Sequence, residues 1–230
     1  MRKYKHLFFD LDHTLWDFTT NEQETLNDLY NKYNLKNYFT NYNKFFENYK
    51  PINDDLWLKY MQGQIKKKDL IVYRFHVTFL NAGLNDINLA KEFAKEFVRI
   101  NSEKKAVMPH TFELMNYLKP HYKMHIITNG FAESQKIKLE KSGLSQYFEK
   151  LFISEHIGAQ KPKKAFFEYA IKSCNARKKE SLVIGDSLEA DIKGAQNFGL
   201  DHVFYNPNKI EYSQEVFKEI SSLKELIGWL

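Results

Sequence analysis

Short apolar runs recur along this chain, and they constrain its fold more than any other feature. They lie at residues 6–9, 124–127, 151–153, 182–184 and 202–205. Between the later runs the apolar residues take helical spacing, as in residues 166–174 after a proline. Strands that alternate with helices form a parallel sheet that is covered on both sides. The sequence therefore predicts an α/β fold.

The segment 16–105 has a different pattern. It lacks a convincing strand, and its apolar residues recur at helical spacing, first behind a candidate capping box, Thr20-x-x-Gln23, and again near its end. These apolar residues are Leu26, Leu29, Tyr30, Tyr33, Leu89, Phe93, Phe97 and Ile100. We expect an all-helical domain over residues 16–105, inserted into a core domain made of residues 1–15 and 106–230.

Charge and composition exclude several classes of protein. The 230 residues carry 34 Lys and Arg against 29 Asp and Glu, a smaller excess than nucleic-acid binders concentrate on one face. The single cysteine, Cys174, permits no intramolecular disulfide and no cysteine-based metal site. No stretch approaches the roughly 18 apolar residues of a membrane span, and the first apolar run is too short for a signal peptide. We expect a cytoplasmic protein with no nucleic-acid polymer and no membrane as partner.

Polar residues follow four of the predicted strands. Asp10 and Asp12 come directly after the first, Thr128 follows the second, Lys161 lies in the loop beyond the third, and Asp186 follows the fourth, with Asp191 close behind it. Because ligands bind outside the carboxyl ends of parallel strands, these side chains should converge there. The sequence predicts an acidic site that also holds one hydroxyl and one cation.

Two carboxylates from different strand ends suit Mg²⁺, which prefers hard oxygen ligands. The sequence has no cysteine or histidine cluster of the kind that binds zinc. A carboxylate such as Asp10 is also a competent nucleophile for phosphoryl transfer, through an aspartyl-phosphate. A second carboxylate beside it, Asp12, can protonate the leaving oxygen and later deprotonate the attacking water.

The remaining polar residues suit a phosphate group. Thr128 can donate a hydrogen bond to a phosphate oxygen, and we expect Asn129 and Gly130 to begin a helix whose free N–H groups suit an anion. Lys161 can neutralise charge on the nucleophile and on the phosphoryl group. Each motif alone is ordinary turn or cap chemistry. Their conjunction, in this order after successive strands, indicates an active site.

These four motifs resemble those of the haloacid dehalogenase-like hydrolases, and the resemblance covers essentially the whole chain. The matching segments are DLDHTL (residues 10–15), ITNG (127–130), KP (161–162) and GDSLEAD (185–191). The resemblance implies a Rossmann-like core with a helical cap inserted after the first motif. The presence of Asp12 weighs against true dehalogenase action, because expulsion of a halide needs no acid.

The resemblance also implies a role for each matching residue. Asp10 is the nucleophile and an Mg²⁺ ligand, and Asp12 is the general acid and base and a ligand through its carbonyl group. Asp186 is a direct ligand, whereas Asp191 orients water or Lys161. Thr128 and Lys161 bind the phosphoryl group, and Asn129 is expected to bind it as well.

Local sequence segments such as ITNGF and GDSLEADI are similar to those of the pyrimidine 5′-nucleotidases of this family. It implies a phosphomonoesterase, monomeric or homodimeric, that takes a small phosphorylated metabolite, with a nucleoside monophosphate preferred. Three alternatives stay open. They are a phosphatase for a sugar phosphate or another small metabolite, a receiver-like phosphoacceptor, which would lack the helical insertion and the second acid, and a binding protein without catalysis.

Overall fold

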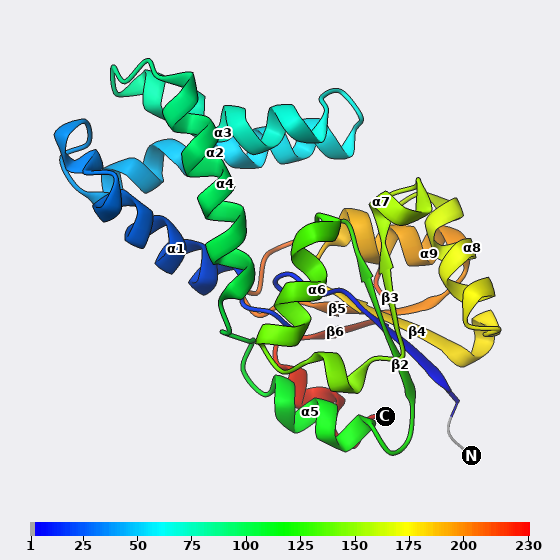
Figure 1. Ribbon diagram of the computed structural model, residues 1–230. Coiled ribbons are helices and arrows are strands. Elements are labelled where there is room, and N and C mark those ends of the chain that lie inside the picture. Colours follow the sequence, from blue (N-terminus) through cyan, green and yellow to red (C-terminus); the bar gives the residue numbers. More distant parts are fainter. Residues whose placement is uncertain (1–2) are drawn as a thin grey trace. The chain divides into compact units, whose positions relative to one another are not determined.

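The structure is a computed structural model that describes residues 3–230 and divides into two compact units (Figure 1). The first unit comprises Met1–Thr19 and Lys104–Leu230, and the second comprises Thr20–Glu103. The second unit therefore interrupts the first in the sequence, and the first unit is built from two separate pieces of chain.

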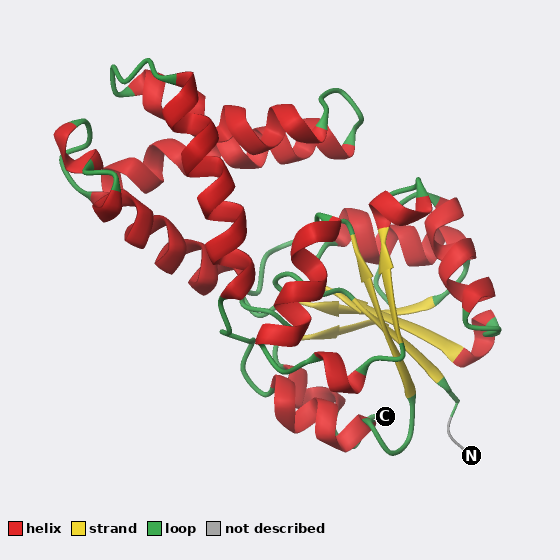
Figure 2. Cartoon of the chain, in the orientation of Figure 1, coloured by secondary structure: helices red, strands yellow, loops and turns green. Residues whose placement is uncertain are grey.

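A sheet of six parallel strands forms the centre of the first unit, in the order β3-β2-β1-β4-β5-β6 (Figure 2). The strands are β1 His6–Phe9, β2 Lys123–Thr128, β3 Lys150–Ile153, β4 Ser181–Gly185, β5 Asp201–Tyr205 and β6 Lys218–Ile220. The five apolar runs are β1 to β5, so the predicted α/β fold with a parallel sheet is confirmed. The edge strand β6 was not predicted.

Alternating residues of the strands build two separate cores, one on each face of the sheet. Leu7 and Phe9 of β1 face a cluster that includes residues of α5 (Thr111–Leu118), α6 (Ala132–Lys141) and η5 (Leu223–Leu226). Phe8, between them, faces residues of α8 (Lys164–Ser173) and α9 (Gly194–Phe198). Helices thus cover both faces, as a parallel sheet requires.

Shorter helical segments complete the first unit. They are η2 Ser145–Tyr147, α7 Ser154–Ile157, η3 Lys178–Glu180 and the π-helical η4 Leu188–Lys193. Two of them follow a strand end directly, since α7 begins after β3 and η4 begins shortly after β4. The chain therefore becomes helical again within three residues of the ends of β3 and β4.

The second unit is helical, and none of its residues, all of which the structure describes, forms a strand. Its elements are α1 Phe18–Lys32, η1 Leu35–Asn37, α2 Tyr42–Met61, α3 Lys67–Asn81 and α4 Ile87–Glu103. Leu26, Leu29 and Phe93 are buried in one cluster with Phe45 and Phe75, as their helical spacing predicts. The predicted capping box is wrong, because α1 begins at Phe18 and Thr20 lies inside its first turn.

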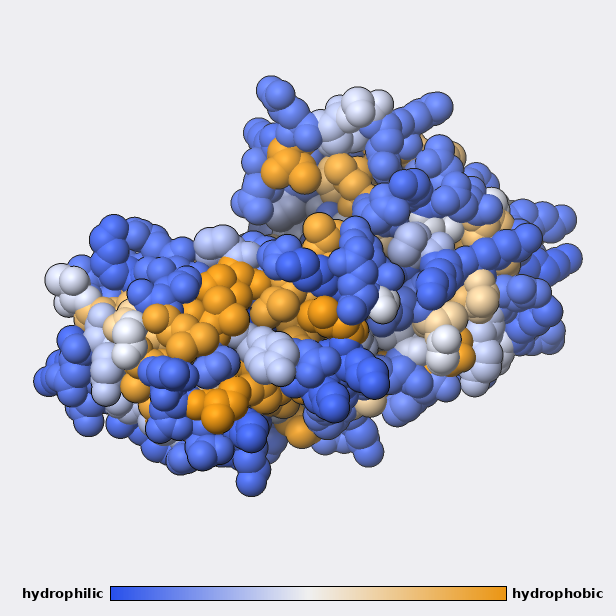
Figure 3. Space-filling model, turned by 90° about the horizontal axis from the view of Figure 1, so that it is seen from above, coloured by the Kyte–Doolittle hydropathy of each residue, from blue (hydrophilic) through white to orange (hydrophobic). Residues whose placement is uncertain are grey.

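Hydrophilic side chains cover most of the face seen in Figure 3, with hydrophobic residues gathered between them. The helical unit leaves some large hydrophobic side chains exposed, among them Leu58, Tyr73 and Leu80. No helix within residues 3–230 is long and apolar enough to cross a membrane.

Candidate active site

The polar residues that follow β1, β2 and β4 come from three adjacent strands. Asp10 directly follows β1, Thr128 is the last residue of β2, and Asp186 directly follows β4. The backbone N–H of Asp10 donates to the carbonyl of Ile184 at 2.9 Å, which extends the β1–β4 ladder to the aspartate itself. The sheet therefore fixes where these side chains start.

Three carboxylates gather at this edge of the sheet. Asp10, Asp186 and Asp191 each offer an oxygen atom, and these atoms lie within 4.8 Å of one another. The ammonium group of Lys161 lies between two of them, at 2.6 Å from Oδ1 of Asp10 and 2.6 Å from Oδ1 of Asp191. It also donates to the carbonyl of Ile127 at 3.0 Å. The sequence-predicted carboxylates and cation thus meet, although they are up to 181 positions apart.

Burial dominates the electrostatics of the cluster. It raises the pKa of Asp10 well above its usual range, against the opposing effect of Lys161. Burial, assisted by Asp191, raises the pKa of Asp186 to about 7. Burial alone would lower the pKa of Lys161, but Asp10 and Asp191 outweigh it and the pKa is raised. Lys161 is therefore an ammonium ion at any ordinary pH.

The residues present fit a divalent cation. Three carboxylates face a single ammonium group, and the raised pKa values of Asp10 and Asp186 show that this one cation does not offset the cost of their negative charges. Carboxylate oxygens are the hard ligands that Mg²⁺ prefers. Two of the three predicted metal ligands, Asp10 and Asp186, contribute oxygens to this group, whereas the carboxylate of Asp12 is directed elsewhere.

Asp191 has both of its oxygens engaged by the protein. Oδ1 pairs with Lys161, and Oδ2 accepts the backbone N–H of Ser187 at 3.1 Å. The close approach requires a glycine at position 185, because a Cβ there would lie 2.3 Å from Oδ2 of Asp191. Asp191 is thereby held as a partner of Lys161.

Thr14 is a further site residue, for which sequence reasoning predicts no role. Its hydroxyl donates to Oδ1 of Asp186 at 2.9 Å, and its side chain is completely buried. The signal that marks it is its place in the DLDHTL segment, four residues after Asp10. Thr14 therefore orients a carboxylate that comes from another strand.

A tight turn after β1 carries Asp12 away from the three carboxylates. The N–H groups of Leu15 and Trp16 both donate to the carbonyl of Leu11, and His13 adopts a left-handed φ of 66°. The carboxylate of Asp12 consequently faces α6, where it accepts from Lys138 at 2.6 Å and from Gln135 at 3.1 Å. Sequence reasoning missed these two residues, which are separated from Asp12 by more than 120 positions.

Thr128 and Asn129 hold the loops of the site together. The hydroxyl of Thr128 accepts the N–H of Gly130 at 3.0 Å and lies 3.4 Å from Oε1 of Gln135. The amide side chain of Asn129 bonds the backbone of Lys161 twice, as donor to its carbonyl and acceptor from its N–H, both at 2.9 Å. Asn129, predicted beside the phosphoryl group, thus fixes the position of Lys161.

The start of the helix after β2 differs from the expectation. α6 begins at Ala132, not at Asn129 and Gly130, because Phe131 is still extended. The N–H of Ala132 donates to Oε2 of Glu155 at 2.7 Å. A carboxylate of the protein therefore already occupies part of the helix terminus that was expected to receive an anion.

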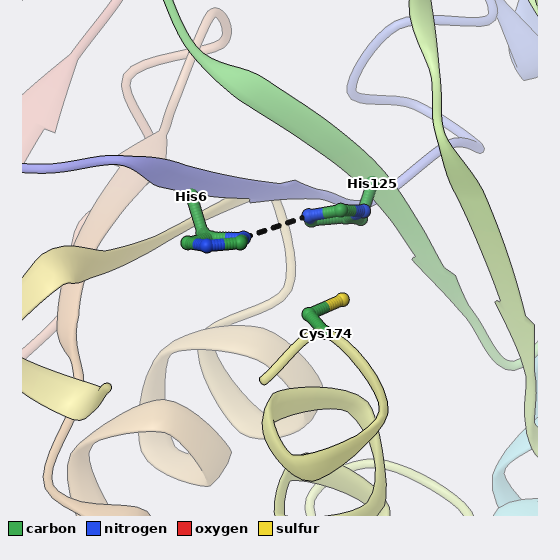
Figure 4. Close-up of side chains that lie close together, drawn as sticks. All are labelled: His6, His125 and Cys174. Atoms are coloured by element: carbon green, nitrogen blue, oxygen red, sulfur yellow. Dashed lines mark hydrogen bonds between the residues drawn. The ribbon is translucent and has the colours of Figure 1, made fainter. Parts of the chain in front are cut away.

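A second buried group lies on the same sheet, at the opposite end of β1. His6 and His125 lie on adjacent strands, and Cys174 follows the end of α8 (Figure 4). Nδ1 of His6 and Nε2 of His125 share a hydrogen bond of 3.1 Å, so one nitrogen directs its N–H at the lone pair of the other. Burial lowers the pKa of His6 and lowers that of His125 to about 3. The lowered pKa of both rings favours their neutral forms. Ligand atoms of His6, His125 and Cys174 lie within 4.8 Å of one another, so the fold brings together a histidine and cysteine group that the sequence does not reveal.

Comparison with known proteins gives concordant results. A model of the family "haloacid dehalogenase-like hydrolase" matches residues 4–199. The pyrimidine 5′-nucleotidase YjjG of Escherichia coli (strain K12) is 33% identical over 97% of this chain and 96% of its own length. The pyrimidine 5′-nucleotidase PynA of Streptococcus pneumoniae is 32% identical over 99% of this chain and 95% of its own length.

A solved structure agrees with these relatives. The magnesium-bound HAD-hydrolase YfnB of Bacillus subtilis has a TM-score of 0.89 to this chain, with 30% sequence identity and coverage of 99% of both chains. The family match and the full-length relatives confirm the resemblance carried by the four motifs. The chain is therefore an enzyme that belongs to the haloacid dehalogenase-like hydrolases.

Proposed function

We propose that this enzyme is an Mg²⁺-dependent phosphomonoesterase that works through an aspartyl-phosphate on Asp10, with a nucleoside 5′-monophosphate as substrate. The observation that carries the proposal is the buried contact of Lys161 with Asp10 and Asp191, beside the carboxylate of Asp186. A carboxylate held 2.6 Å from a buried ammonium group supports the role of nucleophile for Asp10. The nucleotide substrate is supported by the pyrimidine 5′-nucleotidases to which the whole chain is similar.

In the first step, a carboxylate oxygen of Asp10 attacks phosphorus, and the bond from phosphorus to the ester oxygen breaks. The leaving oxygen takes a proton from Asp12, which gives the free alcohol. Lys161 holds Oδ1 of Asp10 and so orients the nucleophile before the substrate arrives. Asp191 accepts a hydrogen bond from Lys161 and so holds the ammonium group in place during the transfer of the phosphoryl group.

In the second step, Asp12 removes a proton from a water molecule, and the water oxygen attacks the phosphorus of the aspartyl-phosphate. The bond between phosphorus and Asp10 breaks, which releases inorganic phosphate and restores the carboxylate. Asp12 thus ends with the proton that the next cycle needs. The balanced reaction consumes one water molecule and yields one alcohol and one phosphate.

Asp10 and Asp186, with the carbonyl group of Asp12, would hold the Mg²⁺ ion, and Thr14 would orient Asp186 through its hydroxyl. When bound, the ion supplies positive charge that offsets the carboxylates and the phosphoryl oxygens. Thr128 donates to a phosphoryl oxygen, and Lys161 neutralises another. Asn129 acts through Lys161, because its side chain makes two hydrogen bonds to the backbone of Lys161.

We further propose that the first unit is the catalytic core and that the helical unit, within the expected range 16–105, is the cap that selects the substrate. All residues named in the two chemical steps belong to the first unit. The core then supplies the reaction common to phosphate esters, and the choice of ester is left to the helical unit.

A phosphate-release screen tests the proposal, with nucleoside monophosphates and sugar phosphates offered at equal concentration. We expect Mg²⁺-dependent release that favours pyrimidine nucleoside monophosphates and that Asp10→Asn abolishes. Glu140→Gln, an exposed change on α6, is the matched control and should retain full activity. Preference for a sugar phosphate would overturn the substrate, whereas full turnover by Asp10→Asn would overturn the mechanism.

A further inference from the structure

Lys138 is a buried cation that none of the four motifs includes. Its side chain is only 4% exposed, and its ammonium group lies 2.6 Å from Oδ1 of Asp12. The rings of Trp16 and Phe18 lie beneath the same ammonium, with centroids at 4.2 Å and 5.1 Å. Contacts on several sides therefore fix this group in one place.

Gln135 holds the other oxygen of the same carboxylate. Its Nε2 donates to Oδ2 of Asp12 at 3.1 Å, and its side chain is almost completely buried. Gln135 and Lys138 are three residues apart on α6, so they project from the same face of the helix. Each oxygen of Asp12 thus receives one donor from one rigid helix.

A purely structural role explains this arrangement poorly. Lys138 lies against apolar residues of the first core, where a well-packed apolar side chain of similar volume is often as stable as a buried ion pair. Apolar packing cannot fix the rotation of the Asp12 carboxylate. Two donors on one helix, Lys138 and Gln135, can fix it, because each binds a different oxygen of that carboxylate. The orientation of Asp12 decides whether it reaches the leaving oxygen and the attacking water.

We propose that Lys138 and Gln135 are positioning residues that hold the carboxylate of Asp12 in the orientation needed for proton transfer. This inference rests on the proposed function, in which Asp12 is the general acid and base. Lys138 acts on the reaction only through Asp12, and it contacts neither Asp10 nor Lys161. Its removal leaves the nucleophile in place and impairs both proton transfers. For the first of them, one oxygen of Asp12 exchanges its donor for the proton that it delivers, and for the second Asp12 acts as the carboxylate that both donors hold.

Substrates with different leaving groups separate the two steps. The p-nitrophenolate ion leaves without protonation, so formation of the aspartyl-phosphate from p-nitrophenyl phosphate does not need Asp12. Hydrolysis of the intermediate still does. Lys138→Met should therefore show a burst of about one p-nitrophenolate per chain, followed by a steady state about 10- to 100-fold slower than that of the unchanged enzyme. With an alkyl phosphate ester it should show the same slowing without a burst.

A double-mutant cycle tests whether Lys138 acts through Asp12. In the Asp12→Asn background, Lys138→Met should change kcat less than about twofold, because the group that it positions is already disabled. Gln135→Leu should follow the same pattern with a smaller effect, and Lys138→Arg should restore part of the activity. Lys141→Met, on an exposed position of the same helix, is the matched control.

Three outcomes would overturn the inference. They are an unchanged kcat in Lys138→Met, equal slowing of burst and steady state, and full additivity with Asp12→Asn. If Lys138→Met unfolds, as its thermal transition will show, the same cycle run with Gln135→Leu decides the matter. If the unchanged enzyme releases no phosphate from any ester, the proposed function fails, and the failure is visible before any variant is made.

Discussion

Two buried clusters of titratable side chains lie on one sheet of this protein, and they solve the problem of burial in opposite ways. The carboxylates of Asp10 and Asp191, beyond the carboxyl end of β1, each lie 2.6 Å from the ammonium group of Lys161. His6 and His125, toward the other end, are neutral and share one hydrogen bond. A buried ion pair is weak evidence for stability, because the desolvation of both charges is costly. The charged cluster is therefore the one that requires a functional explanation.

Among the changes that test the difference between the two clusters, Lys161→Met should have the largest effect. It removes the cation that orients Asp10 and leaves buried carboxylates together, so we expect kcat/KM for phosphate release to fall by about 1,000-fold or more. The matched change in the other cluster, Cys174→Ser, should leave kcat/KM within about twofold, since Cys174 takes part in neither step. A Lys161→Met enzyme of near-normal activity would show that the cluster is not the catalytic one.

Addition of Mg²⁺ should distinguish the clusters by stability. A ligand that binds only the folded state at 100 times its Kd adds about 2.7 kcal/mol to the free energy of unfolding. We expect the thermal transition to rise with Mg²⁺, and to respond far less in Asp186→Asn. His125→Phe should keep the full response. Chelation by EDTA should abolish phosphate release, and excess Mg²⁺ should restore it. A response that survives Asp186→Asn but is lost in His125→Phe would reverse the assignment.

The smallest expected effect concerns pH. Burial, with His6, Lys150 and Lys123 nearby, lowers the pKa of His125 to about 3 in the folded protein, against about 6.5 for an exposed histidine. As the pH falls from 6.5 toward 3, the unfolded chain binds a proton that the folded chain does not. The free energy of unfolding should therefore decrease by up to about 1.4 kcal/mol per pH unit through this residue.

His125→Phe should make that decrease shallower between pH 6 and pH 4, measured by urea unfolding of the metal-free protein. The same substitution at an exposed histidine, His121→Phe, is the matched control. An identical slope in His125→Phe and the unchanged protein would show that His125 is protonated in the folded state.

Much of the first unit follows from local sequence. Strands β1 to β5 are apolar runs long enough to be recognised one at a time, and the polar residues after them lie at a common edge because parallel strands share their direction. β6 was not recognised because only one of its three residues, Lys218–Ile220, is apolar. A strand at the edge of a sheet does not require a longer apolar run. The capping box failed because Thr20-x-x-Gln23 is a short pattern that also fits the inside of a helix.

Contacts between segments that are distant in the sequence could not be predicted from local patterns. Motif spacing located Asp12, but nothing in it indicates that Gln135 and Lys138 project toward that carboxylate from α6. The hydrogen bond between His6 and His125 likewise depends on the register of β1 and β2. In that register Phe8 lies opposite His125, and His6 reaches His125 diagonally. The two hydrogen bonds between Asn129 and the backbone of Lys161 could not be foreseen either, because they depend on the course of the loop after β3.

The place of β1 in the sheet has a consequence for how the chain folds. β1 is synthesised first, yet its two neighbours are β2 and β4, which begin at residues 123 and 181. Pairing over such separations is slow, because the intervening chain must be ordered before the contacts form. The helical unit consists of contiguous sequence with local contacts, and during synthesis it can fold while β1 still waits for both partners. Asp10, the proposed nucleophile, thus precedes both partner strands of β1 in the chain and reaches its final surroundings among the last events of folding.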